Sequence, residues 1–295
     1  MIQNKIKGVG VALITPFNNY SVDYEALGRM VEYVIAGGVD YIVALGSTAE
    51  TATLSLKERD EVLRFVVERA NRRVPIVAGM GSNNTADLVE MLHSFNLDGV
   101  DAILSVVPYY NKPSQEGIYR HFMAVAEASP VPVIIYNVPG RTGLNMTAAT
   151  TLRLAHATKK IVAIKEACGN IEQMQAILDG RPEEFLVLSG DDGLTVELVK
   201  RGGDGVISVA ANAFPERFCN TIHAAMTGNI ATAEEQMAEL IPSIDLLFRE
   251  GNPVGVKSMT AAMGLTRAEV RLPLVDGTEQ LMTDIKSAIE RYELR

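Results

Sequence analysis

The chain is poor in cysteine and has no hydrophobic run long enough to cross a membrane. Its two cysteines, Cys168 and Cys219, form no spacing motif, which fits reduced thiols better than a disulfide framework. The apolar runs are interrupted and strand-length, whereas a membrane-spanning helix needs about 20 apolar residues. Residues 1–5 lack the apolar core of a signal peptide. We therefore expect a cytoplasmic protein with no membrane association.

Basic residues and histidines are also scarce. Lysine and arginine number 27 against 36 aspartates and glutamates, which gives a net charge of −9. Proteins that bind nucleic acids carry basic stripes, and because the sequence has none, no nucleic-acid partner is expected. The four histidines, His93, His121, His156 and His223, fall in segments with a helical pattern and not at strand ends. No metal site is therefore expected.

Short apolar runs alternate along the chain with segments of helical periodicity. The runs are rich in β-branched residues and are followed by turn residues, which is typical of buried strands. Helical periodicity is clear at residues 57–70 and 115–128. The eight apolar runs cover residues 9–14, 41–45, 76–78, 102–107, 133–136, 161–164, 185–188 and 205–209. Strands that alternate with helices in this way indicate parallel βα units.

Eight such units predict an α/β fold, a (β/α)8 TIM barrel. The alternative is an open doubly wound sheet, but Thr15-Pro16-Phe17 follows the first strand where that fold would have a glycine-rich turn. Further helices are predicted after the eighth strand, at residues 214–226, 231–250, 254–263 and 278–292. We therefore take residues 1–212 as the barrel core. Residues 213–295 form the last barrel helix and a C-terminal helical extension of the same structural unit.

Lys165 is the most informative residue for function. It closes the apolar run 161–164 at the end of the predicted sixth strand, where an ammonium group is costly to desolvate. Loss of the proton relieves this cost, and a neutral amine is a nucleophile for a carbonyl carbon. The structural alternative is an ion pair with a carboxylate at another strand end. Lys165 thus predicts an enzyme that forms an imine.

Hydroxyl groups dominate the C-terminal ends of the predicted strands, where the reactive groups of a TIM barrel gather. Tyr136 ends the strand before Lys165 and is well placed to exchange a proton with a carbinolamine, with Ser47 and Tyr110 as further members of a hydroxyl chain. The backbone amides of the turn at Ser47 suit a substrate carboxylate. The planar guanidinium of Arg141 suits a second one.

Several of these features also have ordinary structural explanations. Ser47 and Glu50 match a helix capping box. Arg141 lies in a Pro-Gly-Arg-Thr-Gly turn, where an exposed arginine is common. Asp191 and Asp192 follow the seventh strand, and an N-cap for the next helix is favoured there over a metal site. The functional interpretation therefore depends on whether these groups meet at one mouth.

Together the motifs resemble the signatures of the dihydrodipicolinate synthase family, among the pyruvate-dependent class I aldolases. The matching segments extend over essentially the whole chain. They are Gly46-Ser47-Thr48-Ala49-Glu50, Pro108-Tyr109-Tyr110-Asn111-Lys112-Pro113, Tyr136-Asn137-Val138-Pro139-Gly140-Arg141-Thr142-Gly143, Ile164-Lys165-Glu166-Ala167 and Ser189-Gly190-Asp191-Asp192.

The resemblance implies a lyase that condenses pyruvate with aspartate 4-semialdehyde to 4-hydroxy-tetrahydrodipicolinate, in the diaminopimelate route to lysine. It implies a homotetramer and a covalent pyruvate imine, with no metal or separate cofactor. It also implies residue roles. Lys165 would be the Schiff-base lysine and Tyr136 the general acid/base. Ser47 and Tyr110 would form a proton relay, in which Tyr110 serves a neighbouring subunit. The substrate contacts would be Thr48, Arg141, Gly190 and the main chain of Ile207.

The turn after the second strand departs from the family pattern. The family turn is usually Gly-Thr-Thr-Gly-Glu, whereas Ser47 and Ala49 stand here. With a serine at this position, the turn also resembles that of the related N-acetylneuraminate lyases. The alternative is therefore a pyruvate-dependent sugar-acid aldolase, either an N-acetylneuraminate lyase or an aldolase of the 2-keto-3-deoxy acid type. Those lyases lack the Arg-Thr-Gly sequence at Arg141, which favours the synthase.

Two other classes remain as competing hypotheses. A metal-assisted hydrolase with a carbamylated lysine would need histidines at strand ends. A binding barrel without catalysis is opposed by the intact lysine, tyrosines and arginine.

Overall fold

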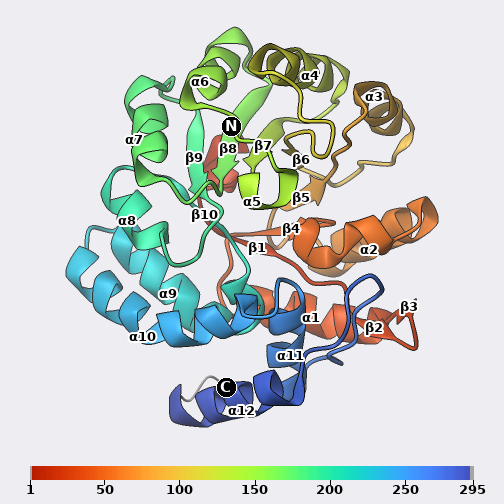
Figure 1. The fold of residues 1–295 in the computed structure, drawn as a ribbon, viewed down its shortest axis with the longest axis vertical. Coiled ribbons are helices and arrows are strands. Elements are labelled where there is room, and N and C mark those ends of the chain that lie inside the picture. Colours follow the sequence, from red (N-terminus) through yellow and green to blue (C-terminus); the bar gives the residue numbers. More distant parts are fainter. Residues whose placement is uncertain (1, 293–295) are drawn as a thin grey trace.

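Eight parallel strands close into a barrel at the centre of the protein (Figure 1). The computed structural model describes residues 2–292. Around the barrel the strand order is β1-β10-β9-β8-β7-β6-β5-β4. The strands are β1 (Gly8–Ala12), β4 (Tyr41–Ala44), β5 (Ile76–Gly79), β6 (Ala102–Val106), β7 (Val133–Asn137), β8 (Ile161–Glu166), β9 (Leu186–Ser189) and β10 (Gly205–Ser208). The closed order confirms the TIM barrel and excludes the open doubly wound sheet.

Two hydrophobic layers explain why these short runs are strands. Successive side chains of a strand point to opposite faces. Here one set, which includes Val43, Ile134 and Leu188, fills the barrel interior. The other set, which includes Ile42 and Ile135, packs outward with the surrounding helices. Because both faces are buried, the strands read as continuous apolar runs.

Helices alternate with the strands and surround them (Figure 1). In α2, for example, Val62, Leu63, Val66 and Ala70 form the buried face. The helices of this ring are α1 (Tyr24–Ala36), α2 (Leu56–Ala70), α3 (Thr85–Ser94), α4 (Gln115–Ala128), α6 (Ala148–Ala157), α7 (Ile171–Gly180), α8 (Thr195–Lys200) and α9 (Pro215–Met226). The four histidines lie on α3, α4, α6 and α9, as expected.

The C-terminal part adds α10 (Ile230–Phe248), α11 (Val254–Ala262) and α12 (Glu279–Tyr292). These three helices pack against one another on one side of the barrel (Figure 1). Smaller elements are the short helix α5 (Pro139–Thr142), the antiparallel hairpin β2 (Phe17–Asn18) and β3 (Ser21–Val22), and 3-10 helices at Ile2–Lys5, Ser47–Ala49, Thr51–Thr53 and Ala210–Asn212.

The position of Lys165 agrees with the sequence prediction. Strand β8 ends in Lys165 and Glu166, so the lysine lies at the C-terminal end of the strand. All eight barrel strands are parallel, and their C-terminal ends therefore open at the same mouth. Lys165 stands at this mouth.

Candidate active site

A cavity of about 180 Å³ opens at the C-terminal ends of the strands. It is lined by most of the site residues that were predicted from the sequence, namely Ser47, Thr48, Tyr136, Arg141, Lys165 and Gly190. They come from β7, from β8 and from the segments after β4, β7 and β9, far apart in the sequence. The fold thus brings a lysine, hydroxyl groups and an arginine together at one site.

Lys165 lies at the base of this site and is only 5% exposed. Its Nζ is 4.3 Å from the centre of the Tyr136 ring, and the two residues are register partners on β8 and β7. Burial lowers the pKa of Lys165 to about 8; the charge of Asp192 opposes this effect, and that of Arg141 adds to it. The amine is therefore far closer to neutrality at physiological pH than an exposed lysine.

Tyr136 is a neighbour of Lys165 that is suited to proton transfer. Its side chain is hydrogen-bonded to that of Ser47. Burial raises the pKa of Tyr136, while Arg141 and the hydrogen bond from Ser47 act in the opposite direction. The phenol consequently keeps its proton at neutral pH, and Ser47 offers that proton a route onward.

The turn that carries Ser47 and Thr48 is a short 3-10 helix preceded by Gly46. The predicted capping box between Ser47 and Glu50 is wrong, because Glu50 has a left-handed backbone (φ 53°) and pairs with Lys257 instead. The capping box occurs instead at the start of α2. There the Glu58 amide donates to Ser55 Oγ at 3.2 Å, and the Ser55 amide donates to Glu58 Oε2 at 2.9 Å.

Asn252 joins Thr48 to Arg141. Its Nδ2 donates to Thr48 Oγ1 at 2.9 Å, and its carbonyl oxygen accepts from Arg141 Nη2 at 2.8 Å. Asn252 also lines the cavity, although the sequence did not nominate it. The Asn-Pro dipeptide after α10 is a turn signal that could have drawn attention to this segment.

The two aspartates after β9 have different environments. Asp191 accepts hydrogen bonds from the amides of Gly193 and Leu194 in the turn before α8. Asp192 is buried and accepts hydrogen bonds from the amides of Val209 and Ala210. The expectation that it caps the next helix is therefore wrong. Burial raises the pKa of Asp192 to about 6. Asp192 is therefore an electrostatic neighbour of Lys165 that the sequence did not reveal.

Three other predicted site residues differ in how they relate to the cavity. Gly190 lines it, and a Cβ there would come within 2.5 Å of Ala167. Ile207 is buried in β10 and does not line the cavity; Val209 does. Tyr110 is 86% exposed and lies outside the cavity. The fold of one chain therefore does not bring Tyr110 to Ser47 and Tyr136.

Comparison with known proteins fits this geometry. The model of the dihydrodipicolinate synthetase family matches residues 5–292. The chain belongs to this family. A 4-hydroxy-tetrahydrodipicolinate synthase of Phocaeicola vulgatus is 53% identical over 276 residues, which are 93% of this chain and 93% of that protein. The family assignment therefore holds over nearly the whole chain.

Solved structures of the dihydrodipicolinate synthetase family superpose closely. A dihydrodipicolinate synthase from Thermotoga maritima has a TM-score of 0.96 at 34% identity, covering 99% of this chain and 100% of that one. A variant described as the first monomeric dihydrodipicolinate synthase has a TM-score of 0.97 at 35% identity and covers 99% of each chain. That protein is described as a monomer, so a chain with this fold can exist without partner subunits.

Within residues 2–292, no group of three or more histidine, cysteine, aspartate or glutamate side chains is arranged to hold a metal ion. No helix in the described part of the chain has both the length and the apolar character needed to span a membrane.

Proposed function

We propose that this chain is a Schiff-base-forming lyase that condenses pyruvate with aspartate 4-semialdehyde to give 4-hydroxy-tetrahydrodipicolinate. The observation that carries the proposal is Lys165, a buried amine with a lowered pKa beside Tyr136 in a cavity at the barrel mouth. The names of relatives at 46–53% identity support the choice of reaction.

The first half of the reaction follows from the chemistry of a neutral amine. Lys165 Nζ attacks the keto carbon of pyruvate to give a carbinolamine, which accepts a proton and loses water to become an imine. Tyr136 supplies that proton, and Ser47 passes it onward. The pyruvate carboxylate lies against Thr48 and the amides of its turn. The imine then loses a proton from its methyl carbon to become an enamine.

The second half needs a site for the aldehyde substrate. The enamine carbon attacks the aldehyde carbon, whose oxygen takes up a proton. The substrate amine then attacks the imine carbon, which closes the ring and releases Lys165 as a free amine. Arg141 at the mouth binds the carboxylate of the semialdehyde. The sum is one water released for each ring formed, and no separate cofactor takes part.

We further propose that the enzyme works as a cytoplasmic homotetramer in which Tyr110 completes the hydroxyl chain of a neighbouring subunit. The support is the geometry of Tyr110, which stands 86% exposed with a left-handed backbone (φ 71°). A large exposed aromatic on a constrained loop is well placed to enter a second copy of the chain.

Borohydride reduction in the presence of pyruvate tests the central step. A reduced pyruvate adduct on Lys165, found by peptide mass spectrometry and absent from Lys165→Ala, is the expected result. An unmodified Lys165 would refute the imine mechanism. A coupled assay with aspartate semialdehyde, run beside one with sugar acids, separates the synthase from a sugar-acid aldolase.

A further inference from the structure

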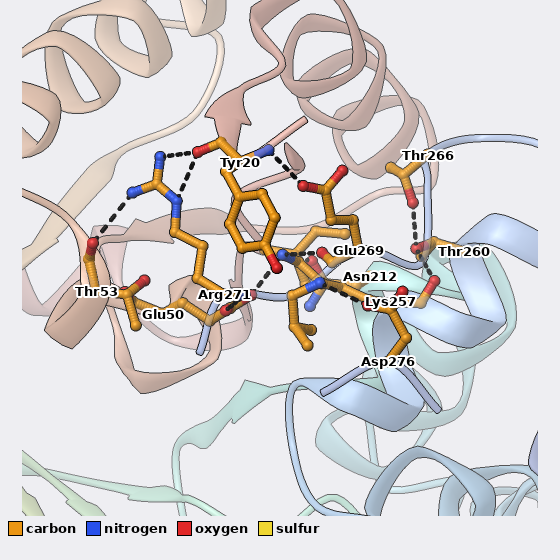
Figure 2. Close-up of polar contacts among 12 residues, drawn as sticks. Tyr20, Glu50, Thr53, Asn212, Lys257, Thr260, Thr266, Glu269, Arg271 and Asp276 are labelled. Carbon is orange, nitrogen blue, oxygen red and sulfur yellow. Dashed lines mark hydrogen bonds and ion pairs between the residues drawn. The ribbon is translucent and has the colours of Figure 1, made fainter. Parts of the chain in front are cut away.

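A buried ion pair links the C-terminal helices to the turn that carries Ser47 and Thr48. Lys257 on α11 pairs with Glu50, and both side chains are almost completely buried (Figure 2). Withdrawing two charges from water carries a desolvation cost, and such pairs often stabilise a fold no better than apolar residues of similar size. In some proteins such a pair instead fixes a defined geometry. The pair therefore points to a role other than stabilising the fold, namely fixing the position of the turn.

The rest of the cluster fixes both partners in place. Lys257 Nζ donates to the carbonyl oxygen of Glu269 at 2.9 Å and lies 3.9 Å from the centre of the Phe17 ring. The second carboxylate oxygen of Glu50 accepts from the amide of Arg271 at 2.9 Å. Both oxygens of Glu50 are thus held by the C-terminal segment.

Arg271 extends the same cluster to neighbouring backbone. Its guanidinium donates to the carbonyl oxygens of Thr53 and Tyr20 (Figure 2). It also pairs with the carboxylate of Glu58. Thr53 belongs to the second 3-10 helix after β4, and Glu58 to the first turn of α2. The segment between β4 and α2 is therefore attached to residues 257–271 at several points.

Glu50 transmits this attachment to the cavity through the backbone. Its amide donates to the carbonyl oxygen of Ser47 at 3.1 Å, which closes the 3-10 turn. Its left-handed conformation is unfavourable for a residue with a Cβ and needs compensation from outside the turn. Removal of the pair would release Glu50, and with it the turn on which Ser47 and Thr48 stand.

Asn252 attaches the same turn from the cavity side. It donates to Thr48 Oγ1 at 2.9 Å, five residues before Lys257 in the sequence. The turn is therefore held at Thr48 by a contact inside the cavity and at Glu50 by the ion pair behind it. Of the two, only the ion pair is remote from the substrate.

We propose that Lys257 is a positioning residue for the reaction, which acts through Glu50 to hold the Ser47 hydroxyl against Tyr136 and the Thr48 hydroxyl toward the substrate carboxylate. The proposal rests on the proposed function, since it assigns to this turn the binding of pyruvate. It gives the C-terminal extension a direct part in the active site. It also explains why a charged pair, and not a hydrophobic contact, occupies this position.

The test replaces the pair without leaving a buried charge unpaired. In the double variant Lys257→Met/Glu50→Gln, thermal unfolding, the pyruvate adduct, KM for pyruvate and kcat are measured. We expect a folded protein whose Lys165 still forms the adduct at saturating pyruvate, because β8 is untouched. KM for pyruvate should rise by about ten- to a hundredfold, the factor that one lost hydrogen bond to a charged group carries.

Lys200→Met is a matched control, since it removes an exposed lysine that pairs with Glu234 at 2.9 Å far from the turn. It should leave KM unchanged. Lys257→Arg keeps the charge and should recover part of the affinity. If the double variant fails to fold, Glu50→Asp keeps both charges of the pair but shortens the link by one methylene group, and a rise in KM is again expected.

Two results would overturn the proposal. The first is a folded double variant, or a folded Glu50→Asp variant, whose KM and kcat stay within about twofold of wild type. The second is a loss of active protein with unchanged KM, which would indicate a purely structural pair. A wild-type protein without a pyruvate adduct would instead refute the proposed function itself, and the positioning role with it.

Discussion

Asn137 Nδ2 donates to Glu166 Oε1 at 2.9 Å, on the outer face of the two strands whose inner face carries Tyr136 and Lys165. Asn137 and Glu166 are register partners, as are the two residues before them. Because neighbouring side chains of a strand point to opposite faces, the outer pair fixes the register of the inner pair. The spacing of Tyr136 and Lys165 therefore depends on a hydrogen bond that no substrate touches.

The first prediction concerns this outer pair. Asn137→Asp would place two carboxylates in contact inside the protein, where Glu166 already has a pKa raised by burial. We expect a loss of about 3 kcal/mol in unfolding free energy at pH 7, the size typical of an uncompensated buried charge. Urea denaturation measures it. The loss should shrink on acidification, because one of the two carboxyl groups takes up a proton. Equal stability of the variant and the wild type at pH 7 would contradict the role of the Asn137–Glu166 pair.

The second prediction concerns the pH dependence of imine formation. Burial lowers the pKa of Lys165 to about 8, so the neutral, reactive amine appears as pH rises through this value. About one molecule in ten is then neutral at pH 7, against fewer than about one in a thousand at the ordinary lysine pKa. Borohydride trapping rates measured from pH 6 to 10 should therefore level off above pH 8. A rate that still climbs steeply at pH 10 would mean an unperturbed amine.

The third prediction separates the two substrates. Arg141→Ala removes the guanidinium at the mouth and its bond to the Asn252 carbonyl oxygen, but it leaves Lys165 in place. We expect KM for aspartate semialdehyde to rise by about ten- to a hundredfold while the pyruvate adduct still forms. Steady-state kinetics and trapping, run on the same preparation, give both values. Equal losses for the two substrates would refute the assigned role.

The sequence predicted the barrel and most of its mouth because strong local signals coincide with the fold. The buried runs are strands since both of their faces are apolar, and the predicted helix 115–128 matches α4. Lys165 stood out because a charge ends an apolar run. These features depend only on neighbours in the chain.

Other features were missed because they depend on distant contacts. Ser47 and Glu50 have the spacing of a capping box, yet Glu50 turns away because Lys257 and Arg271, over 200 residues later, hold its carboxylate. Asn252 was not nominated because its partner Thr48 is remote in sequence. The hairpin of β2 and β3 escaped because strands of two residues have no periodicity to detect.

The fourth prediction tests whether Tyr110 acts in a neighbouring subunit. Tyr110→Phe and Lys165→Ala should each be nearly inactive alone. After unfolding, mixing and refolding, a symmetric interface that exchanges Tyr110 would give about a quarter of wild-type activity, because half of the pairs are mixed and each has one intact site. Steady-state rates of the mixture and of the separate variants decide it. No recovery would mean that Tyr110 does not act in the site of a neighbouring subunit.

The fifth prediction concerns His121, a buried residue of α4 whose Nδ1 lies 2.9 Å from Thr85 Oγ1. Burial lowers its pKa to about 4. The unfolded chain, with a histidine pKa near 6.5, therefore takes up the proton first as pH falls. His121 should thus cost the fold up to about 3 kcal/mol between pH 6.5 and pH 4, and His121→Leu should remove this loss. Urea denaturation at a series of pH values measures it.

His223 on α9 provides a control of opposite sign. Its Nε2 lies 2.7 Å from Asp40 Oδ2, and that hydrogen bond raises its pKa. The stability from His223 is therefore complete below its unfolded pKa and is lost as pH rises through the folded value. Hence His223→Gln should be most damaging in acid, whereas His121→Leu should be most protective there. Two variants with parallel pH curves would show that neither histidine has the environment described.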